Sequence, residues 1–85
     1  MSVRYWAAAK AAAGVASEPF ATDRALTLGE VIDRAVAAHP GSRLAEVLRA
    51  CSALVNDLPV SSSDPGAVVV PLGSTVEFLP PFAGG

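Results

Sequence analysis

The last six residues, Pro80-Pro81-Phe82-Ala83-Gly84-Gly85, have the composition best suited to chemistry in this chain. Glycine has no Cβ, so a Gly-Gly end can enter a narrow channel that any side chain would block. The two prolines stiffen the exit from the preceding segment, because their rings fix φ. This order favours a carboxylate at Gly85 that is threaded into another protein's active site. A glycine-rich end is also typical of a frayed terminus.

The remaining sequence offers no catalytic constellation. His39 stands before Pro40-Gly41 at a predicted helix end, where a basic residue complements the helix dipole. Cys51 completes an apolar helical stripe, which predicts a small packing residue and not a nucleophile. The sequence contains no Cys/His cluster for a metal and no glycine loop with a following lysine for a nucleotide. We therefore expect no metal site and no bound cofactor, and a protein on which other enzymes act.

Composition further limits the kinds of protein that this chain could be. Eighty-five residues make one domain, and 52% of them are hydrophobic, which provides material for a core. The net charge is -2 with basic residues scattered singly, so no nucleic-acid or anionic membrane partner is expected. Apolar runs are too short to span a bilayer, and the N-terminus is typical of a strand and not of a signal peptide. A single cysteine fits a reducing cytoplasm.

Local patterns predict five strands and three helices. The expected strands cover residues 3–6, 18–25, 52–56, 67–70 and 75–79. Pro19 places the second of them at a sheet edge, because it lacks an N–H. The first helix, residues 7–13, is almost all alanine and ends at Gly14.

The second and third helices follow from capping residues and apolar stripes. Thr27 and Glu30 form a capping box, and the helix that it begins ends at His39. Ser42 is expected to cap the next helix, which runs to Cys51. Strands at both ends with helices between them predict an α+β domain over residues 1–79, with helices on one face of a mixed sheet. Residues 80–85 are expected to be a flexible tail, and the loop over residues 58–70 shows no obvious paired strand.

Three segments of this chain resemble the β-grasp, ubiquitin-like sulfur carriers of the MoaD/ThiS type. The closest resemblance is to the MoaD family, the small subunit of molybdopterin synthase. The segments are an opening strand with Lys10 and Gly14 after it, Leu54-Val55-Asn56, and the run from Val76 to Gly85 that contains Pro-Pro-x-x-Gly-Gly. The resemblance implies a β-grasp fold for the whole chain.

It also implies a carrier chemistry in molybdenum cofactor biosynthesis. A separate, MoeB-like enzyme would use ATP to adenylate the Gly85 carboxylate, and a sulfur donor would convert it to a thiocarboxylate. The large subunit of molybdopterin synthase, a MoaE-like protein, would then receive the tail and transfer the sulfur to a pterin precursor. Residues 80–84, which are Pro80, Pro81, Phe82, Ala83 and Gly84, would thread into these partners.

Partner contacts are expected near the base of the tail. Leu79 and Phe82 are predicted to dock a partner, while Phe78 is predicted to enter the core. If the first and last strands lie side by side, the sheet gains a second apolar face that suits a partner. Lys10, the sole lysine, is either a contact for a partner carboxylate or AMP phosphate, or a solvated helix residue.

Three alternatives stay open. A carrier of the same fold could serve thiamine, cysteine or tRNA thiolation pathways. A ubiquitin-like modifier would be joined to lysines through Gly85. A plain interaction module would carry an inert tail, and deletion of Gly84 and Gly85 would leave its function intact.

Overall fold

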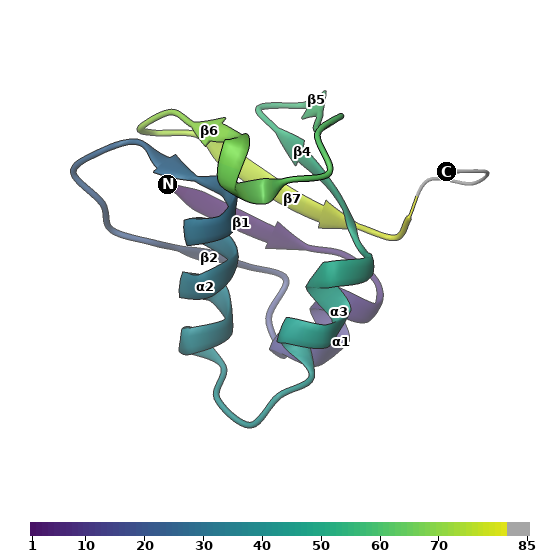
Figure 1. Cartoon of the computed structure of the whole chain (residues 1–85). Helices are drawn as coiled ribbons and strands as arrows, with labels where there is room; N and C mark the ends of the chain where they lie inside the picture. The colour runs from purple at the N-terminus through teal and green to yellow at the C-terminus, as the bar shows by residue number, and fades with distance from the viewer. Residues whose placement is uncertain (82–85) are drawn as a thin grey trace.

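A five-stranded mixed sheet is the framework of the computed structural model, which describes residues 1–81 (Figure 1). In spatial order its strands are β2 (Ser17–Pro19), β1 (Ser2–Tyr5), β7 (Thr75–Leu79), β4 (Ser52–Val55) and β5 (Leu58–Pro59). β1 and β7 are parallel, and the other neighbours are antiparallel. The first and last strands therefore lie side by side, and β7 leads the chain out of the middle of the sheet.

The helices gather on one side of this sheet (Figure 1). They are α1 (Ala8–Ala13), α2 (Leu28–Ala38), α3 (Leu44–Ala50) and a short 3-10 helix, η1 (Pro65–Ala67). Two further short strands, β3 (Leu26–Thr27) and β6 (Val69–Val70), pair with each other as a separate antiparallel ribbon. The predicted α+β class, with helices on one face of a mixed sheet, is confirmed.

Strand alternation decides which side chains enter the core. Val3 and Tyr5 on β1, with Val76 and Phe78 beside them on β7, are each at most 1% exposed. The rings of Tyr5 and Phe78 stack with centroids 6.2 Å apart. The helices close this core with Leu28, Val31, Ala35, Leu44 and Leu48. The prediction that Phe78 belongs to the core is confirmed, and burial of such a side chain contributes roughly 1.5 to 3 kcal/mol.

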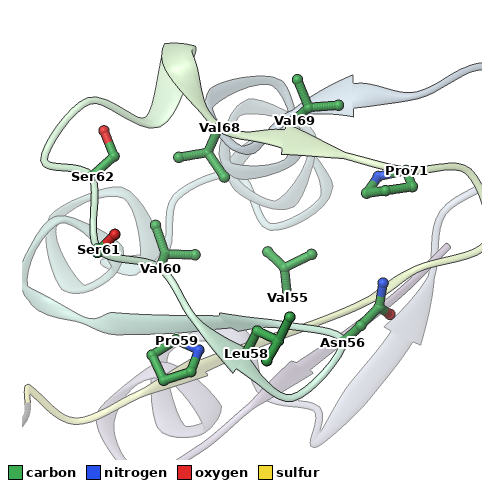
Figure 2. A pocket seen from close by; sticks show the side chains of 10 residues that line it. All are labelled: Val55, Asn56, Leu58, Pro59, Val60, Ser61, Ser62, Val68, Val69 and Pro71. Atoms are coloured by element: carbon green, nitrogen blue, oxygen red, sulfur yellow. The ribbon is translucent and has the colours of Figure 1, made fainter.

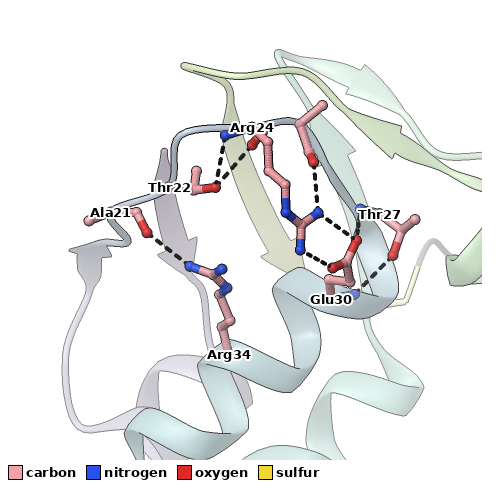
Figure 3. A network of polar contacts seen from close by, with 7 residues as sticks. Ala21, Thr22, Arg24, Thr27, Glu30 and Arg34 are labelled. Carbon is pink, nitrogen blue, oxygen red and sulfur yellow. Dashed lines mark hydrogen bonds and ion pairs between the residues drawn. The ribbon is translucent and has the colours of Figure 1, made fainter.

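The start of α2 is fixed by the predicted capping box (Figure 3). Thr27 Oγ1 accepts from the Glu30 N–H at 3.1 Å, and Glu30 Oε1 accepts from the Thr27 N–H at 3.0 Å. Arg24 adds an ion pair of 2.8 Å to the same carboxylate. These donors, Arg24 first, lower the pKa of Glu30 to about 2. Arg34 ties α2 to the preceding loop by donating to the Ala21 carbonyl at 2.9 Å.

Two sequence predictions need correction in the connecting segments. Residues 18–25 do not form one strand, because β2 ends at Pro19 and β3 begins only at Leu26. Between them Thr22 Oγ1 accepts from the Arg24 N–H at 3.3 Å, a local turn contact that competes with strand pairing. The loop over residues 58–70 does contain paired strands, since β5 pairs with β4 and β6 with β3. Both strands have only two residues, too few to give a visible alternation.

In the Leu54-Val55-Asn56 segment, the asparagine is the residue that connects the β4–β5 hairpin to β7. Asn56 and Asp57 link β4 to β5 with φ values of 50° and 69°, as a type I′ hairpin turn requires. Asn56 Oδ1 accepts from the Thr75 N–H at 2.9 Å, and its Nδ2 donates to Ser74 Oγ at 3.0 Å. One side chain thus joins the hairpin to the start of β7.

Candidate functional site at the end of the last strand

The candidate site begins where β7 ends. Leu79, the last strand residue, is half-buried and lies opposite Ser52 of β4. Pro80 and Pro81 follow and are exposed. The other predicted tail residues, Phe82, Ala83, Gly84 and Gly85, lie outside the described residues.

Trp6 holds the end of β7 in two ways. Its backbone N–H donates to the Phe78 carbonyl at 3.1 Å, and its indole Nε1–H donates to Glu77 Oε1, also at 3.1 Å. The Arg4 guanidinium lies over the indole, 5.2 Å from the ring centroid, and 3.7 Å from the Glu77 carboxylate. Glu77 is only 9% exposed. The indole N–H and the Arg4 guanidinium both interact with the Glu77 carboxylate, and these contacts offset the cost of burying it.

These contacts correct the expectation of a second apolar face. β1 and β7 do lie side by side, but the middle of the face opposite the helices carries Arg4, Trp6 and Glu77. Leu54 and Leu79 flank this cluster, because Leu54 lies opposite Glu77 in the β4–β7 register. We call these five residues the open face. It combines a polar centre with apolar edges, and it contains Trp and Arg, two residue types that are enriched in protein interfaces.

A hollow of about 360 Å³ lies beside the tail base. Its lining combines the beginning of α1, one side of α3 and the two prolines, and consists of Trp6, Ala7, Ala8, Ala9, Arg43, Glu46, Val47, Ala50, Cys51, Pro80 and Pro81. Its two charged members, Arg43 and Glu46, pair with each other at 2.8 Å. The interior is therefore mostly apolar, and the prolines form part of its wall.

Lys10 is exposed on α1, one residue beyond Ala9, and is not among the residues that line the hollow. The structure shows no contact that brings it together with Leu79 or the prolines among the described residues. Both interpretations of Lys10 stay open as predictions.

The histidine and the cysteine have structural surroundings. His39 caps the C-terminus of α2, and its Nε2 lies 2.6 Å from Glu18 Oε2, which also accepts from the Tyr5 hydroxyl at 2.7 Å. Burial, and then the contact with Glu18, raises the pKa of Tyr5 far above its ordinary range. Burial also raises the pKa of the half-buried Cys51 thiol, which disfavours the reactive thiolate. These groups join elements and do not form a nucleophilic site.

The part of the chain that the structure describes contains no cluster of three or more His, Cys, Asp or Glu residues suited to a metal ion. A second hollow, of about 400 Å³, lies between the β4–β5 hairpin and β6 (Figure 2). Its lining residues, drawn in Figure 2, are valines, prolines, Leu58, Asn56 and two serines, and none of them is an acid or a base. No helix within residues 1–81 has the length and hydrophobicity that crossing a membrane requires.

Sequence reasoning missed Arg4 and Glu77. Each alternates with core residues along its strand, a position that predicts a solvated charge. Their association depends on the parallel β1–β7 register, in which Arg4 lies opposite Glu77.

Comparison with known proteins agrees with this architecture. A model of the ThiS family matches residues 3–85. The crystal structure of SAMP1 from Haloferax volcanii superimposes with a TM-score of 0.74 at 21% sequence identity, covering 99% of this chain and 97% of that chain. This likeness confirms the β-grasp fold. Comparison with curated protein sequences gave no match. The chain therefore belongs to the ThiS family of ubiquitin-like sulfur carriers.

Proposed function

We propose that this chain is the sulfur-carrier subunit of a molybdopterin synthase, with the Gly85 carboxylate as the group that carries sulfur. The observation that carries the proposal is the position of β7. This central strand leads directly to the exposed Pro80 and Pro81, and the sequence then continues Phe-Ala-Gly-Gly. Membership of the ThiS family supports the carrier chemistry. The Pro-Pro-x-x-Gly-Gly sequence favours the molybdopterin pathway.

The proposed chemistry has two covalent steps on Gly85. A carboxylate oxygen attacks the α-phosphorus of ATP, pyrophosphate leaves, and an acyl-adenylate forms. A sulfide or persulfide donor then attacks the carbonyl carbon, a C–S bond forms and AMP leaves. With a persulfide donor the first product is an acyl disulfide; a thiol then attacks the donor's own sulfur, the S–S bond breaks, and the terminal sulfur stays on the Gly85 carbonyl while the donor leaves as a disulfide with that thiol. The product is a thiocarboxylate, a strong nucleophile that is best shielded from water inside a partner's pocket.

The catalytic groups would belong to the partners. The ATP-dependent step requires a MoeB-like adenylating enzyme, and the transfer of sulfur to the pterin precursor requires the large, MoaE-like subunit. We propose that these partners contact Leu79, at the apolar edge of the open face, and that Phe82 adds an apolar anchor. The proposed site of action is the cytoplasm.

The proposal is tested by the intact mass of the protein after incubation with ATP, a MoeB-like enzyme and sulfide. The expected result is a mass increase equal to one oxygen replaced by one sulfur. The same incubation without ATP, and with a variant that lacks Gly84 and Gly85, should give no increase. An unchanged mass with an enzyme that loads a related carrier under the same conditions would overturn the carrier assignment.

The pathway is tested by adding a MoaE-like large subunit to the sulfur-loaded protein. Consumption of the thiocarboxylate that depends on a pterin precursor supports the molybdopterin pathway. Consumption instead by the thiazole-forming, cysteine-forming or tRNA-thiolating enzymes would assign this carrier to another pathway.

A ubiquitin-like modifier is the second candidate, and the fold shared with SAMP1 is compatible with it. This function predicts isopeptide bonds between Gly85 and lysines of other proteins in cells. The single lysine, Lys10, leaves this chain one internal acceptor side chain for polymer formation, which favours the carrier. Mass spectrometry of tagged protein from cells would distinguish them, because abundant lysine adducts occur only with a modifier.

A further inference from the structure

We propose that Trp6 is a positioning residue that sets the direction in which the tail leaves β7, and thereby the rate at which Gly85 is activated. The inference rests on the proposed carrier function. It assigns a role to a side chain that follows β1, far from the tail in the sequence, and does not itself react.

The first argument is the double attachment of Trp6 to β7. Its backbone N–H bonds to the Phe78 carbonyl, and its indole N–H bonds to the Glu77 carboxylate, so consecutive residues of β7 are held by the one residue that follows β1. Arg4 lies over the ring and also approaches Glu77, which restricts rotation of the indole. The attachment lies immediately before Leu79, where the strand ends.

The second argument concerns the two prolines. Pro80 and Pro81 have no N–H, so they cannot extend the pairing of β7 through donated backbone hydrogen bonds. Direction beyond Leu79 must therefore come from the residues just before the prolines and from packing around them. Trp6 contributes to both, because it also lines the hollow whose wall includes Pro80 and Pro81.

The third argument is the backbone of the neighbouring residue. Ala7 has φ 51° and ψ -121°, a conformation that costs a residue with a Cβ free energy. This conformation turns the chain sharply from β1 into α1, so that Trp6 remains beside β7 while Ala8 and Ala9 line the hollow. Strain of this kind persists where surrounding contacts fix the backbone geometry. Here the fixing contacts are the two hydrogen bonds from Trp6 to the end of β7.

The consequence for activation is geometric. A MoeB-like enzyme that docks the domain receives a productive tail only when the chain leaves β7 toward its active site. Loosening the strand end lowers the productive fraction of docked complexes, and this lowers kcat more than it raises KM. Trp6 therefore affects the rate through the tail and not through docking affinity.

The test compares three variants in adenylation assays with a MoeB-like enzyme. Trp6→Phe keeps an apolar ring but removes the indole N–H, and we expect kcat to fall about fivefold, the rate equivalent of one hydrogen bond, with KM changed less than twofold. Glu77→Leu removes the acceptor yet leaves a residue suited to a strand, and should lower kcat similarly. Glu77→Gln keeps an acceptor for the indole and should recover most of the rate. Equal kcat values for Trp6→Phe and wild type would overturn the proposal.

Val31→Ala is the matched control. Val31 is a buried residue of α2 on the helix side of the sheet, whereas Trp6 and Glu77 lie on the opposite face, so its truncation lowers global stability without removing a Trp6 contact. At a temperature where all variants are folded, its kcat should equal that of wild type. A fall as large as that of Trp6→Phe would mean that the effect comes from stability alone.

A measurement on the free protein separates this proposal from the carrier function. Nuclear magnetic resonance relaxation gives an order parameter for the Leu79 N–H, which should fall in Trp6→Phe and Glu77→Leu but not in Glu77→Gln or Val31→Ala. The chain has one tryptophan, so one indole N–H signal reports the Glu77 contact directly. If wild type is never adenylated, the carrier function fails. If the Leu79 order parameter is the same in every variant, the positioning role fails, whatever the enzyme assay gives.

Discussion

At the scale of single residues, Asn56 supports more structure than its exposed position suggests. Its side chain bonds to the Thr75 N–H and to the buried Ser74 hydroxyl while its backbone has φ 50°. Asn56→Ala loses both contacts and places a less tolerant residue at a positive φ, so we expect a loss of about 2 to 3 kcal/mol in unfolding free energy. Urea denaturation measures it. Asn56→Asp keeps the acceptor for Thr75 and should lose about half as much; an equal loss would refute the separate roles.

At Ala7, in contrast to Asn56, we expect a substitution to stabilise the protein. Its φ of 51° with ψ of -121° is suited to glycine, so Ala7→Gly should raise the unfolding free energy by about 1 kcal/mol. Thermal unfolding detects this as an increase of roughly 4 to 8 °C for a domain of this size. Ala11→Gly, inside α1, is the matched control and should destabilise by about 0.5 to 1 kcal/mol. Destabilisation by both substitutions would show that Ala7 is not strained.

At the scale of the element, the start of α2 makes stability depend on acid. Arg24 and then the Thr27 N–H lower the pKa of Glu30 from 4.5 to about 2. The folded state thus binds this proton more weakly than the unfolded chain, so the contribution is complete above about pH 4.5 and is lost as pH falls toward 2. Urea unfolding at several pH values in this window should show that the unfolding free energy of Glu30→Gln changes less with pH than that of the wild type. Arg24→Gln should move the loss to higher pH, and an unchanged profile in both variants would exclude this cap as its source.

Sequence patterns predicted the longer elements well because each has its own periodicity or cap. The capping box at Thr27, the stop at Gly14 and the strand from Thr75 to Leu79 all occur where the pattern placed them. The predicted strand over residues 67–70 is present only as β6 (Val69–Val70), and the two-residue strands β3 and β5 escaped prediction because two residues give no periodicity; the pairing of β3 depends on the distant β6. Ser42 was expected as the cap of α3; Arg43 occupies that position, although the Ser42 hydroxyl still accepts from the Leu44 N–H at 3.2 Å.

The sequence predicted which residues form the tail of the candidate site but not the contacts that surround the base of the tail. The order Leu79-Pro80-Pro81 and the Gly-Gly end are visible in the chain itself. The contact between Trp6 and Glu77 spans 71 positions, and it depends on the parallel register of the first and last strands. The interpretation of the opposite face as apolar was wrong for the same reason, since a single sequence does not show that Arg4 lies opposite Glu77.

At the scale of the whole molecule, the domain and the reactive end should be separable. The buried core of the described residues ends at Phe78, and Pro80 and Pro81 are exposed. Removal of residues 82–85 should therefore change the unfolding free energy by less than about 0.5 kcal/mol, as is usual for changes away from buried groups. Urea unfolding of the full and shortened chains gives this difference. The same truncation should abolish sulfur loading, because the carboxylate then stands on Pro81.

A second truncation, after Leu79, separates the prolines from the tail. It removes part of the wall of the hollow beside Trp6, so it should cost more stability than removal of residues 82–85 alone. If instead the first truncation costs more than about 1 kcal/mol, the last four residues contribute to folding, and loss of sulfur loading no longer isolates chemistry at Gly85. If both truncations are neutral, the prolines do not pack on the domain. The strand contacts of Trp6 would then have to direct the tail alone.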